Sequence, residues 1–296
     1  MKDIHIASVI TPDMLEQAYI LMHSIKNNKR VDTKINYYLF IEFTPEHGYD
    51  FCKGYLHDLF SFDFHIFTLD VDFYADKINA LATPRVVFLR LLFPQIFNAL
   101  DKIIHLDIDM VCVKDGIEEL WDMPLDYLYL RAVIDPPIHF CPGCHDDFIN
   151  TGNPRYFNAG MMLMNLAQIR QDHKDDELAR WCLKWDSGKL RDIHRDQTIL
   201  NYVLKDHVSL IPFKWNNMVF GISHGTRDSY ALYLKTEGFN DPIESLDDAI
   251  FLHFVGPGKP WNEKEMAWGE KVYPYAALEM ETWDQIIKEK YRKREY

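Results

Sequence analysis

The sequence lacks the features that mark several large classes of protein. Its five cysteines are an odd number scattered over 296 residues, which argues against a disulfide framework and favours a reducing compartment. No window approaches the ~18 consecutive apolar residues of a membrane-spanning helix. The N-terminus, MKDIHIASVI, has no basic region followed by an apolar core and a cleavage site. We therefore expect a cytoplasmic protein that is soluble or peripheral to a membrane.

Basic residues are also outnumbered. The 45 Asp and Glu residues exceed the 32 Lys and Arg residues and give a formal net charge of −13. A protein that binds nucleic acid needs a basic face for the phosphates, so we expect no nucleic-acid partner. No internal repeat and no Gly/Ser linker is visible. With 48% hydrophobic residues, the chain can bury the core of one sizeable α/β domain.

The first part of the chain alternates between strand and helix patterns. Thr11 and Pro12 predict the N-cap and the first residue of a helix, and a second helix is expected near residues 49–60. The strands are expected at residues 4–10, 35–43 and 63–69. Apolar residues recur at helical spacing at Leu15, Ala18, Met22 and Ile25. Such βαβ alternation predicts a largely parallel sheet covered by helices, with ligands at the carboxyl ends of the strands.

Two carboxylates interrupt the apolar run IIHLDIDMVCV, which otherwise has the pattern of a buried strand over residues 103–113. Because alternate side chains of a strand share a face, Asp107 and Asp109 are expected to point the same way and to hold one cation. Burying an unpaired carboxylate costs roughly several kcal/mol, so the pair needs a cation or strong hydrogen bonds. The alternative is that the two residues cap a helix or turn after the strand.

Polar residues stand out in two further segments. YFNAGMMLMN sets Asn158 and Gly160 before an apolar run, and the glycine suits a backbone that approaches a ligand closely. RDQTILN opens a predicted helix with Asp196 and Gln197.

Two more segments carry isolated cations or an imidazole. FLHFVGPGKPW places His253 on a short apolar strand and Gly256 and Lys259 in the Gly/Pro loop that follows. VFLRLLFP places Arg90 on an apolar segment. Arg90 either faces a ligand or forms an ion pair beneath the sheet.

In this order, the five segments resemble the motifs of the family 8 retaining glycosyltransferases, which include glycogenin and, as the nearer type, the bacterial lipooligosaccharide α-galactosyltransferases. The resemblance runs to about Tyr273 and includes ELWDMPLD, KPW and AWGEK. It implies a GT-A type nucleotide-diphosphosugar transferase fold, a mixed, mostly parallel sheet flanked by helices, over residues 1–273. Residues 274–296 are left as a helical basic tail.

The resemblance also implies a metal site formed by Asp107, Asp109 and His253. A mixed carboxylate and imidazole set suits Mn²⁺ better than Mg²⁺ or Ca²⁺, so manganese is expected, with magnesium as the alternative. A cation and basic side chains are needed where negative charge grows on a departing diphosphate. Without the resemblance, His253 is better interpreted as a core histidine.

By the same resemblance, the donor is a UDP-sugar carrying galactose or glucose, and the acceptor is a glycan, glycolipid or glycoprotein. The residues expected around the donor are Ala7, Ser8, Thr11, Arg90, Asp107, Ile108, Asn158, Ala159, Gly160, Gly256 and Lys259. Family members often carry an Asp or Asn that contacts the uracil just after the first strand. This chain has Val9 and Thr11 there, with Asp13 nearby, which leaves the base contact open.

Three residues are expected at the reacting centre: Gln197, Asp196 and Asp135. A glutamine is a poor nucleophile and a poor base, so Gln197 favours a same-face mechanism with retention, in which the leaving phosphate takes the acceptor proton. Double displacement through Asp196 is the alternative. Asp135 resembles a residue that lines the donor or acceptor site, and capping of the loop before two prolines is its alternative role.

Residues 136–155 have the composition of a long loop, with four prolines and two glycines. By resemblance the loop covers the donor as a lid. Its HFCPGCH segment holds Cys141 and Cys144, but zinc would need a second ligand pair, so a Pro-Gly turn is the preferred interpretation.

The C-terminal segment KEKYRKREY carries five basic and two acidic residues. Related bacterial enzymes use such tails on anionic membranes, and a solvated helix end is the equal alternative. Two other functions stay open for the chain. One is a catalytically inactive sugar-nucleotide binding module. The other is a sugar-phosphate nucleotidyltransferase, although a glycine-rich phosphate loop is missing.

Overall fold

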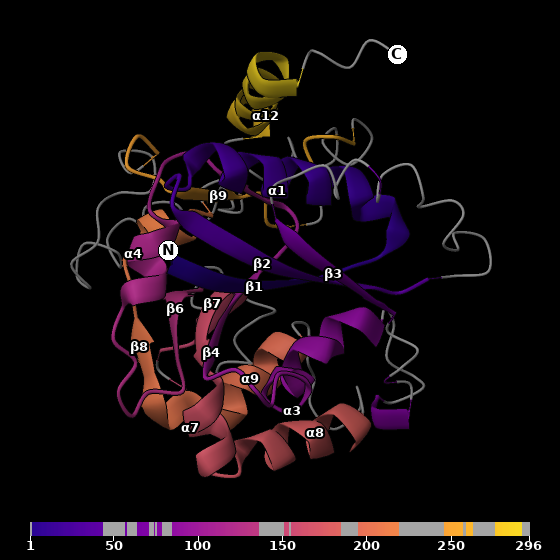
Figure 1. Cartoon of the computed structure of the whole chain (residues 1–296), viewed down its shortest axis with the longest axis vertical. Coiled ribbons are helices and arrows are strands. Elements are labelled where there is room, and N and C mark those ends of the chain that lie inside the picture. The colour runs from indigo at the N-terminus through magenta and orange to yellow at the C-terminus, as the bar shows by residue number, and fades with distance from the viewer. Residues whose placement is uncertain are drawn as a thin grey trace.

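A mixed sheet of seven strands, with helices on both faces, forms the body of the part of the chain that the structure describes (Figure 1). The structure is a computed structural model. It describes residues 2–43, 57, 64–70, 74, 76–78, 85–135, 151–153, 155–184, 195–218, 246–256, 259–262 and 276–291. The predicted helix near residues 49–60, most of the predicted loop 136–155 with Cys141 and Cys144, and the basic side chains from Lys288 onward lie outside the described residues.

The strands of the large sheet follow the order β3-β2-β1-β4-β7-β6-β8, and β5 pairs with β9 in a small separate sheet. Neighbouring strands are parallel except at β4–β7 and β6–β7. This confirms the predicted mixed, mostly parallel sheet, and the three N-terminal strands form within two residues of the expected bounds. The strands are β1 (Lys2–Ile10), β2 (Thr33–Ile41), β3 (His65–Asp70), β4 (Lys102–Leu106), β5 (Met110–Cys112), β6 (Leu130–Ile134), β7 (Phe157–Asn165), β8 (Val208–Leu210) and β9 (Phe251–His253).

The first helical segment begins where the sequence provides a start signal. Thr11 is extended at the N-cap and Pro12 follows as the first residue of a 3₁₀ turn, which is continued by α1. Met14 N–H donates to the Thr11 carbonyl (3.0 Å), so Thr11 caps through its backbone. The described α-helices are α1 (Leu15–Asn28), α3 (Phe93–Ile96), α4 (Ile117–Asp122), α7 (Leu166–Gln171), α8 (Lys174–Lys184), α9 (Asp196–Val203) and α12 (Ala276–Tyr291). The 3₁₀ segments are η1 (Pro12–Met14), η3 (Arg85–Leu92), η4 (Lys205–His207) and η5 (Phe213–Trp215).

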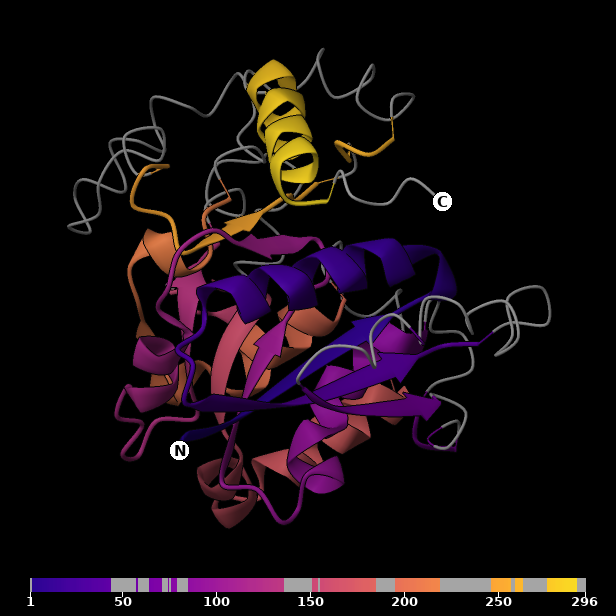
Figure 2. The same ribbon diagram turned by 45° about the horizontal axis from the view of Figure 1, so that its top comes forward.

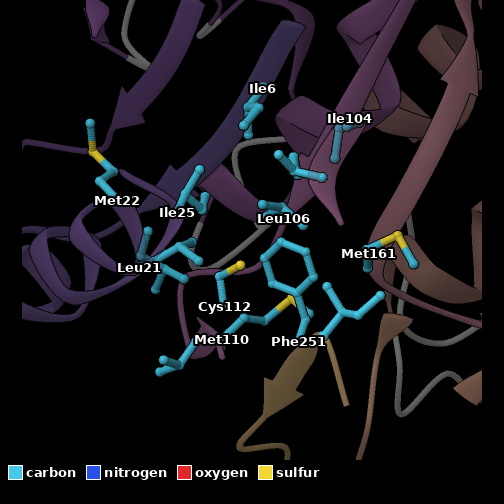
Figure 3. Packing of buried hydrophobic residues seen from close by; sticks show 14 of the residues in the cluster. Ile6, Leu21, Met22, Ile25, Ile104, Leu106, Met110, Cys112, Met161 and Phe251 are labelled. Atoms are coloured by element: carbon cyan, nitrogen blue, oxygen red, sulfur yellow. The ribbon is translucent and has the colours of Figure 1, made fainter. Parts of the chain in front are cut away.

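Two apolar cores lie on the two faces of the large sheet, because side chains alternate along each strand. On β1, Ile4 and Ile6 belong to one core, whereas Ala7 and Val9 belong to the other. The first core joins the large sheet to α1 and to the β5–β9 pair. Figure 3 labels ten of its members: Ile6, Leu21, Met22, Ile25, Ile104, Leu106, Met110, Cys112, Met161 and Phe251. The second core joins the sheet to η3, α3, α7, α8 and α9.

The predicted continuous strand over residues 103–113 is wrong. β4 ends at Leu106 and β5 begins at Met110 in the other sheet, so Asp107 and Asp109 lie in the turn between two strands. Asp107 N–H donates to the Gly160 carbonyl of β7 (2.6 Å), so the chain separates from the large sheet only after Asp107. A strand interior would bury both carboxylates away from their partners, whereas the turn places them at the carboxyl end of β4.

The C-terminal helix α12 lies over β9, on the side of the molecule that carries α1 (Figure 2). Its Trp283 ring packs against Phe254, with centroids 5.2 Å apart, and against Trp261, with centroids 4.8 Å apart. Trp283 and Ile286 are buried in the first core. None of the described helices is both long enough and apolar enough to cross a membrane.

Candidate functional site

Two short strands bring a pair of aspartates and a distant histidine to one point. In the antiparallel β5–β9 pair, Met110 lies opposite His253, and Phe254 N–H donates to the Asp109 carbonyl (2.9 Å). His253 Nε2 lies 3.1 Å from Asp109 Oδ1 and 4.0 Å from Asp107 Oδ2. One ligand atom from each of these three residues lies within 4.8 Å of the others. The three side chains that the sequence proposed as metal ligands therefore converge.

The remaining oxygen of each carboxylate is held by a cationic side chain. Asp107 Oδ1 lies 3.0 Å from Arg90 Nη2, and Asp109 Oδ2 lies 2.6 Å from Lys259 Nζ. Lys259 Nζ also donates to the Phe254 carbonyl (2.6 Å). Each carboxylate therefore has one oxygen fixed by a basic group and the other facing His253.

These cations keep both carboxylates ionised. Burial acts to raise the pKa of Asp107, but the Arg90 guanidinium, together with His105, brings it well below its usual range. Burial likewise opposes ionisation of Asp109, but the Lys259 ammonium and His253 lower its pKa to about 2. Two ionised carboxylates and one imidazole are a donor set that suits Mn²⁺.

Arg90 joins three parts of the site. Its Nη2 pairs with Asp107, its Nε lies 3.1 Å from Asp196 Oδ2, and its Nη1 donates to the Ala159 carbonyl (3.3 Å). Only 6% of Arg90 is exposed. The sequence left open whether Arg90 faces a ligand or forms an ion pair. Arg90 forms ion pairs with Asp107 and Asp196, and both of these carboxylates belong to the predicted site.

A second group of side chains is organised around Asp135, at the end of β6. Asp135 Oδ2 accepts from Gln197 Nε2 (2.8 Å) and from Asn158 Nδ2 (3.1 Å). Gln197 Oε1 accepts the Ala159 backbone N–H (2.9 Å), which fixes the orientation of that amide. Asp135 Oδ1 is buried and has no hydrogen-bond partner among the described residues. The predicted residues Gln197 and Asp135 of the reacting centre are therefore in contact. Asp135 Oδ1 remains available to accept a hydrogen bond from a ligand.

The other residues predicted around the donor lie on or just after β1, between the two aspartates, and in the loop after β9. Ala7 and Ser8 are buried on β1, and the Ser8 hydroxyl donates to the Leu106 carbonyl (2.7 Å), whereas Thr11 is half-buried just beyond the end of β1. Ile108 is buried between the aspartates. Gly256, in the loop after β9, has a φ of 95°, a conformation that favours glycine.

Three residues at the site were not found from the sequence. His105 Nε2 lies 3.2 Å from Asp107 Oδ1, and its place two residues earlier in the same strand pattern was an available signal. Asn216 lies 2.8 Å from His253 Nδ1, and the buried NN pair in the apolar segment FKWNNM was a weaker signal. Glu279 on α12 is only 3% exposed and lies close enough to Lys259 and Asp109 to feel their charges. Nothing in the sequence places α12 there.

Gly160 is required by the close approach of His253. A Cβ at this position would lie 2.3 Å from His253 Cε1 and 2.9 Å from Nδ1. His253 is only 2% exposed, so Gly160→Ala should displace its ring. The variant should bind Mn²⁺ about 10–100-fold more weakly and be less stable by about 1–3 kcal/mol. Isothermal titration with Mn²⁺ and urea denaturation measure the two effects.

Gly152→Ala is the matched control. Gly152 has a φ of 59°, so the added Cβ strains the backbone, but its nearest contact is Lys205 Nζ at 3.6 Å. This variant should lose stability and keep Mn²⁺ affinity. Equal losses of affinity in the two variants would contradict a specific role for Gly160.

Glu279 should make stability depend on pH. Burial raises the pKa of Glu279 to about 8, the Lys259 ammonium opposes the rise, and the Asp109 carboxylate adds to it. A carboxyl group whose pKa is higher in the folded state binds its proton more tightly when folded, so stability falls as pH rises from the ordinary pKa of 4.5 to about 8. Glu279→Gln should therefore gain stability relative to the metal-free wild type across this window, by on the order of a few kcal/mol.

Thermal denaturation at several pH values tests this prediction. Glu281→Gln, the same chemical change at an exposed position of the same helix, is the matched control. A pH-independent difference for Glu279→Gln would show that this carboxyl group is not buried as described.

The fold is shared with solved glycosyltransferase structures. The structure is similar to the galactosyltransferase LgtC, solved with donor and acceptor sugar analogs, with a TM-score of 0.62 and 22% identity over 90% of this chain and 93% of that one. It is also similar to the bifunctional glycosyltransferase WbbM, with a TM-score of 0.67 and 18% identity over 95% of this chain and 51% of that one. These similarities confirm the predicted GT-A type fold.

The chain belongs to glycosyl transferase family 8, whose family model matches residues 5–265. The family predicted from the five motifs is therefore confirmed. A lipopolysaccharide 1,2-glucosyltransferase of Escherichia coli is 29% identical over 186 residues, which make up 61% of this chain and 50% of that protein. The glycosyltransferase GlyE of Streptococcus pneumoniae is 25% identical over 218 residues, 69% of this chain and 45% of that protein. The chain spans about half the length of the curated relatives it matches.

Proposed function

We propose that the protein is a retaining hexosyltransferase that uses a divalent cation to move galactose or glucose from a UDP-sugar to a glycan or glycolipid. The observation that carries the proposal is the convergence of Asp107, Asp109 and His253 beside a buried Arg90 and a partly exposed Lys259. Membership of family 8 supports the same activity.

The residues present fit a divalent cation. Asp107 and Asp109 are held ionised, each with one oxygen on the His253 side, and the imidazole adds a nitrogen ligand. This mixed donor set favours Mn²⁺, with Mg²⁺ as the alternative. When bound, the cation supplies positive charge that stabilises the departing diphosphate.

The chain's own cations complete the neutralisation. Lys259 lies on the loop after β9 with its ammonium beside Asp109, so it would add positive charge next to a cation held by that carboxylate. Arg90 is buried between Asp107 and Asp196 and keeps both carboxylates in place. With a cation bound, Arg90 and Lys259 would together offset the charge of the aspartates, so that an anionic donor could bind to a strongly acidic chain.

The arrangement at the reacting centre favours the same-face route. Asp196 is engaged by Arg90 (3.1 Å), and an ion-paired carboxylate is a weaker nucleophile than a free one. Gln197 is held at both ends of its amide, by Ala159 N–H and by Asp135 Oδ2. In the proposed reaction Gln197 stabilises the oxocarbenium-like sugar, and the leaving phosphate oxygen takes the acceptor's hydroxyl proton.

Asp135 and Asn158 are proposed to orient the donor sugar. The buried Oδ1 of Asp135 has no partner among the residues that the structure describes, and a sugar hydroxyl would satisfy it, because a buried oxygen without a partner is costly. Similarity to a lipopolysaccharide 1,2-glucosyltransferase favours a glycolipid acceptor. A place at the cytoplasmic side of a membrane is part of the same proposal. The basic segment from Lys288 would then contact anionic lipid.

A donor screen tests the proposal. Purified protein is incubated with UDP-galactose, UDP-glucose and other UDP-sugars, with Mn²⁺ or with a chelator, and free UDP is measured with and without a panel of glycan and glycolipid acceptors. We expect Mn²⁺-dependent UDP release from one donor, accelerated by an acceptor. Nucleotide binding without any release would instead identify a sugar-nucleotide binding module.

A further inference from the structure

The two nitrogens of His253 face competing hydrogen-bond acceptors. Nδ1 lies 2.8 Å from Asn216 Oδ1, and Nε2 lies 3.1 Å from Asp109 Oδ1. A neutral imidazole carries one proton, and only a nitrogen without a proton can bind a metal. The group that wins the proton therefore decides whether Nε2 is available to a cation.

A backbone amide fixes the orientation of the neighbouring Asn158. Gly160 N–H donates to the Asn158 side chain (2.9 Å), so the atom that receives it must be the oxygen. The amide nitrogen of Asn158 then faces Asp135 Oδ2 (3.1 Å), which can only accept. Both contacts require the same orientation of the side chain.

Asn158 in turn fixes the orientation of Asn216. The Asn158 oxygen also lies 2.9 Å from the Asn216 side chain, so the Asn216 atom at that contact must be the NH₂ group. The Asn216 oxygen is thereby turned to His253 Nδ1. A reversed amide would place two acceptors together at Asn158, so Asn216 can only accept from the ring.

The position of Asn216 is as strongly fixed as its orientation. The residue is fully buried, at 0% exposure, directly after η5. Its neighbour Asn217 forms two backbone hydrogen bonds with β9. Asn217 N–H donates to the Phe251 carbonyl (3.0 Å), and His253 N–H donates to the Asn217 carbonyl (2.9 Å). The carboxamide therefore has little freedom to move away from the ring.

We infer that Asn216 is a positioning residue that keeps the proton of His253 on Nδ1 and so leaves Nε2 free for the cation. This inference rests on the proposed metal-dependent function. Without Asn216, the Asp109 carboxylate is the remaining acceptor beside the ring and draws the proton to Nε2, where it blocks the metal. Asn216 opposes that effect through a hydrogen bond whose direction is set by the Gly160 backbone.

Three variants test the inference. Asn216→Leu removes the acceptor and keeps the side-chain volume, and should weaken Mn²⁺ binding by about 10–100-fold. Asn216→Asp keeps an acceptor for Nδ1–H but loses the donor to the Asn158 oxygen, so it should bind Mn²⁺ more weakly than the wild type and more tightly than Asn216→Leu. Asn153→Leu is the matched control, because Asn153 is 2% exposed and bonds to Asn201 rather than to the metal group. It should lose stability without losing Mn²⁺ affinity.

The proton position is measured separately, in metal-free protein. Long-range ¹H–¹⁵N correlation spectra of labelled histidine, with His253 assigned by the loss of its signals in His253→Gln, report which ring nitrogen carries hydrogen. For the neutral ring we expect Nδ1–H in the wild type and in Asn216→Asp, and the Nε2–H form in Asn216→Leu.

Each outcome bears on the inference. A bare Nδ1 in the wild type overturns it, and so does an unchanged Mn²⁺ affinity in a folded Asn216→Leu variant or an equal loss of affinity in Asn153→Leu. If the wild type bound no Mn²⁺, the proposed function would fail, whereas the ring tautomer would still test the role of Asn216. If Asn216→Leu does not fold, the wild-type and Asn216→Asp spectra decide.

Discussion

Replacing Asp109 by Asn should abolish sugar transfer, with a loss of about 10³-fold or more in turnover, while the fold is retained. Asp109 Oδ1 is the carboxylate oxygen nearest His253 Nε2 (3.1 Å), and the neutral amide removes the charge that attracts the cation. It also leaves the Lys259 ammonium without its anionic partner, so that only the Phe254 carbonyl still accepts from it among the contacts described above. The change is nearly isosteric, so the near-ultraviolet circular dichroism spectrum should match that of the wild type.

The control for this change is Asp115→Asn. Asp115 is exposed a few residues further along the same segment, and the chemical change is identical. Mn²⁺-dependent UDP release should be lost in Asp109→Asn and unchanged in Asp115→Asn. Residual activity of Asp109→Asn close to the wild-type level would count heavily against the proposed site.

Arg90→Met should cause the largest loss of stability, about 3–5 kcal/mol. Arg90 is buried between Asp107 Oδ1 (3.0 Å) and Asp196 Oδ2 (3.1 Å), so methionine fills much of the space but leaves two carboxylates without their shared cation. Equilibrium urea denaturation measures the loss. Activity should fall as well, because both aspartates lie at the site.

A double-variant cycle separates charge from packing. Asp196→Asn removes one of the two carboxylate charges that Arg90→Met leaves without a cation. The double variant should therefore lose less stability than the sum of the losses in the two single variants. Arg90→Lys should fall between the wild type and Arg90→Met, because an ammonium cannot make all three contacts of the guanidinium. A wild-type denaturation midpoint for Arg90→Met would contradict the described ion pairs.

Local patterns in the sequence were enough to predict the frame of the sheet. Strand β1, the Pro12 start and the buried positions of α1 each depend on residues within one element, and alternation of strand and helix implies a mostly parallel sheet. The antiparallel β7 was not predicted, because its apolar run has the same composition as a buried parallel strand.

The site was predicted in part, and for a partly wrong reason. Asp107 and Asp109 do converge on one point, but through a turn between two sheets and not along one strand. His253 entered through the resemblance to family 8, since no local pattern distinguishes it from a core histidine. Asn216 and Glu279 depend on pairing and packing between segments far apart in the chain, and such contacts leave little trace in local sequence.

The most direct test of the account is the position of a bound metal ion. Crystals grown with Mn²⁺ and UDP would be measured at the manganese absorption edge, where anomalous difference maps locate the ion. We predict one strong peak with Asp107, Asp109 and His253 Nε2 as its protein ligands, at about 2–2.5 Å. A map with no peak among these three side chains, or with the ion bound elsewhere, would contradict the account.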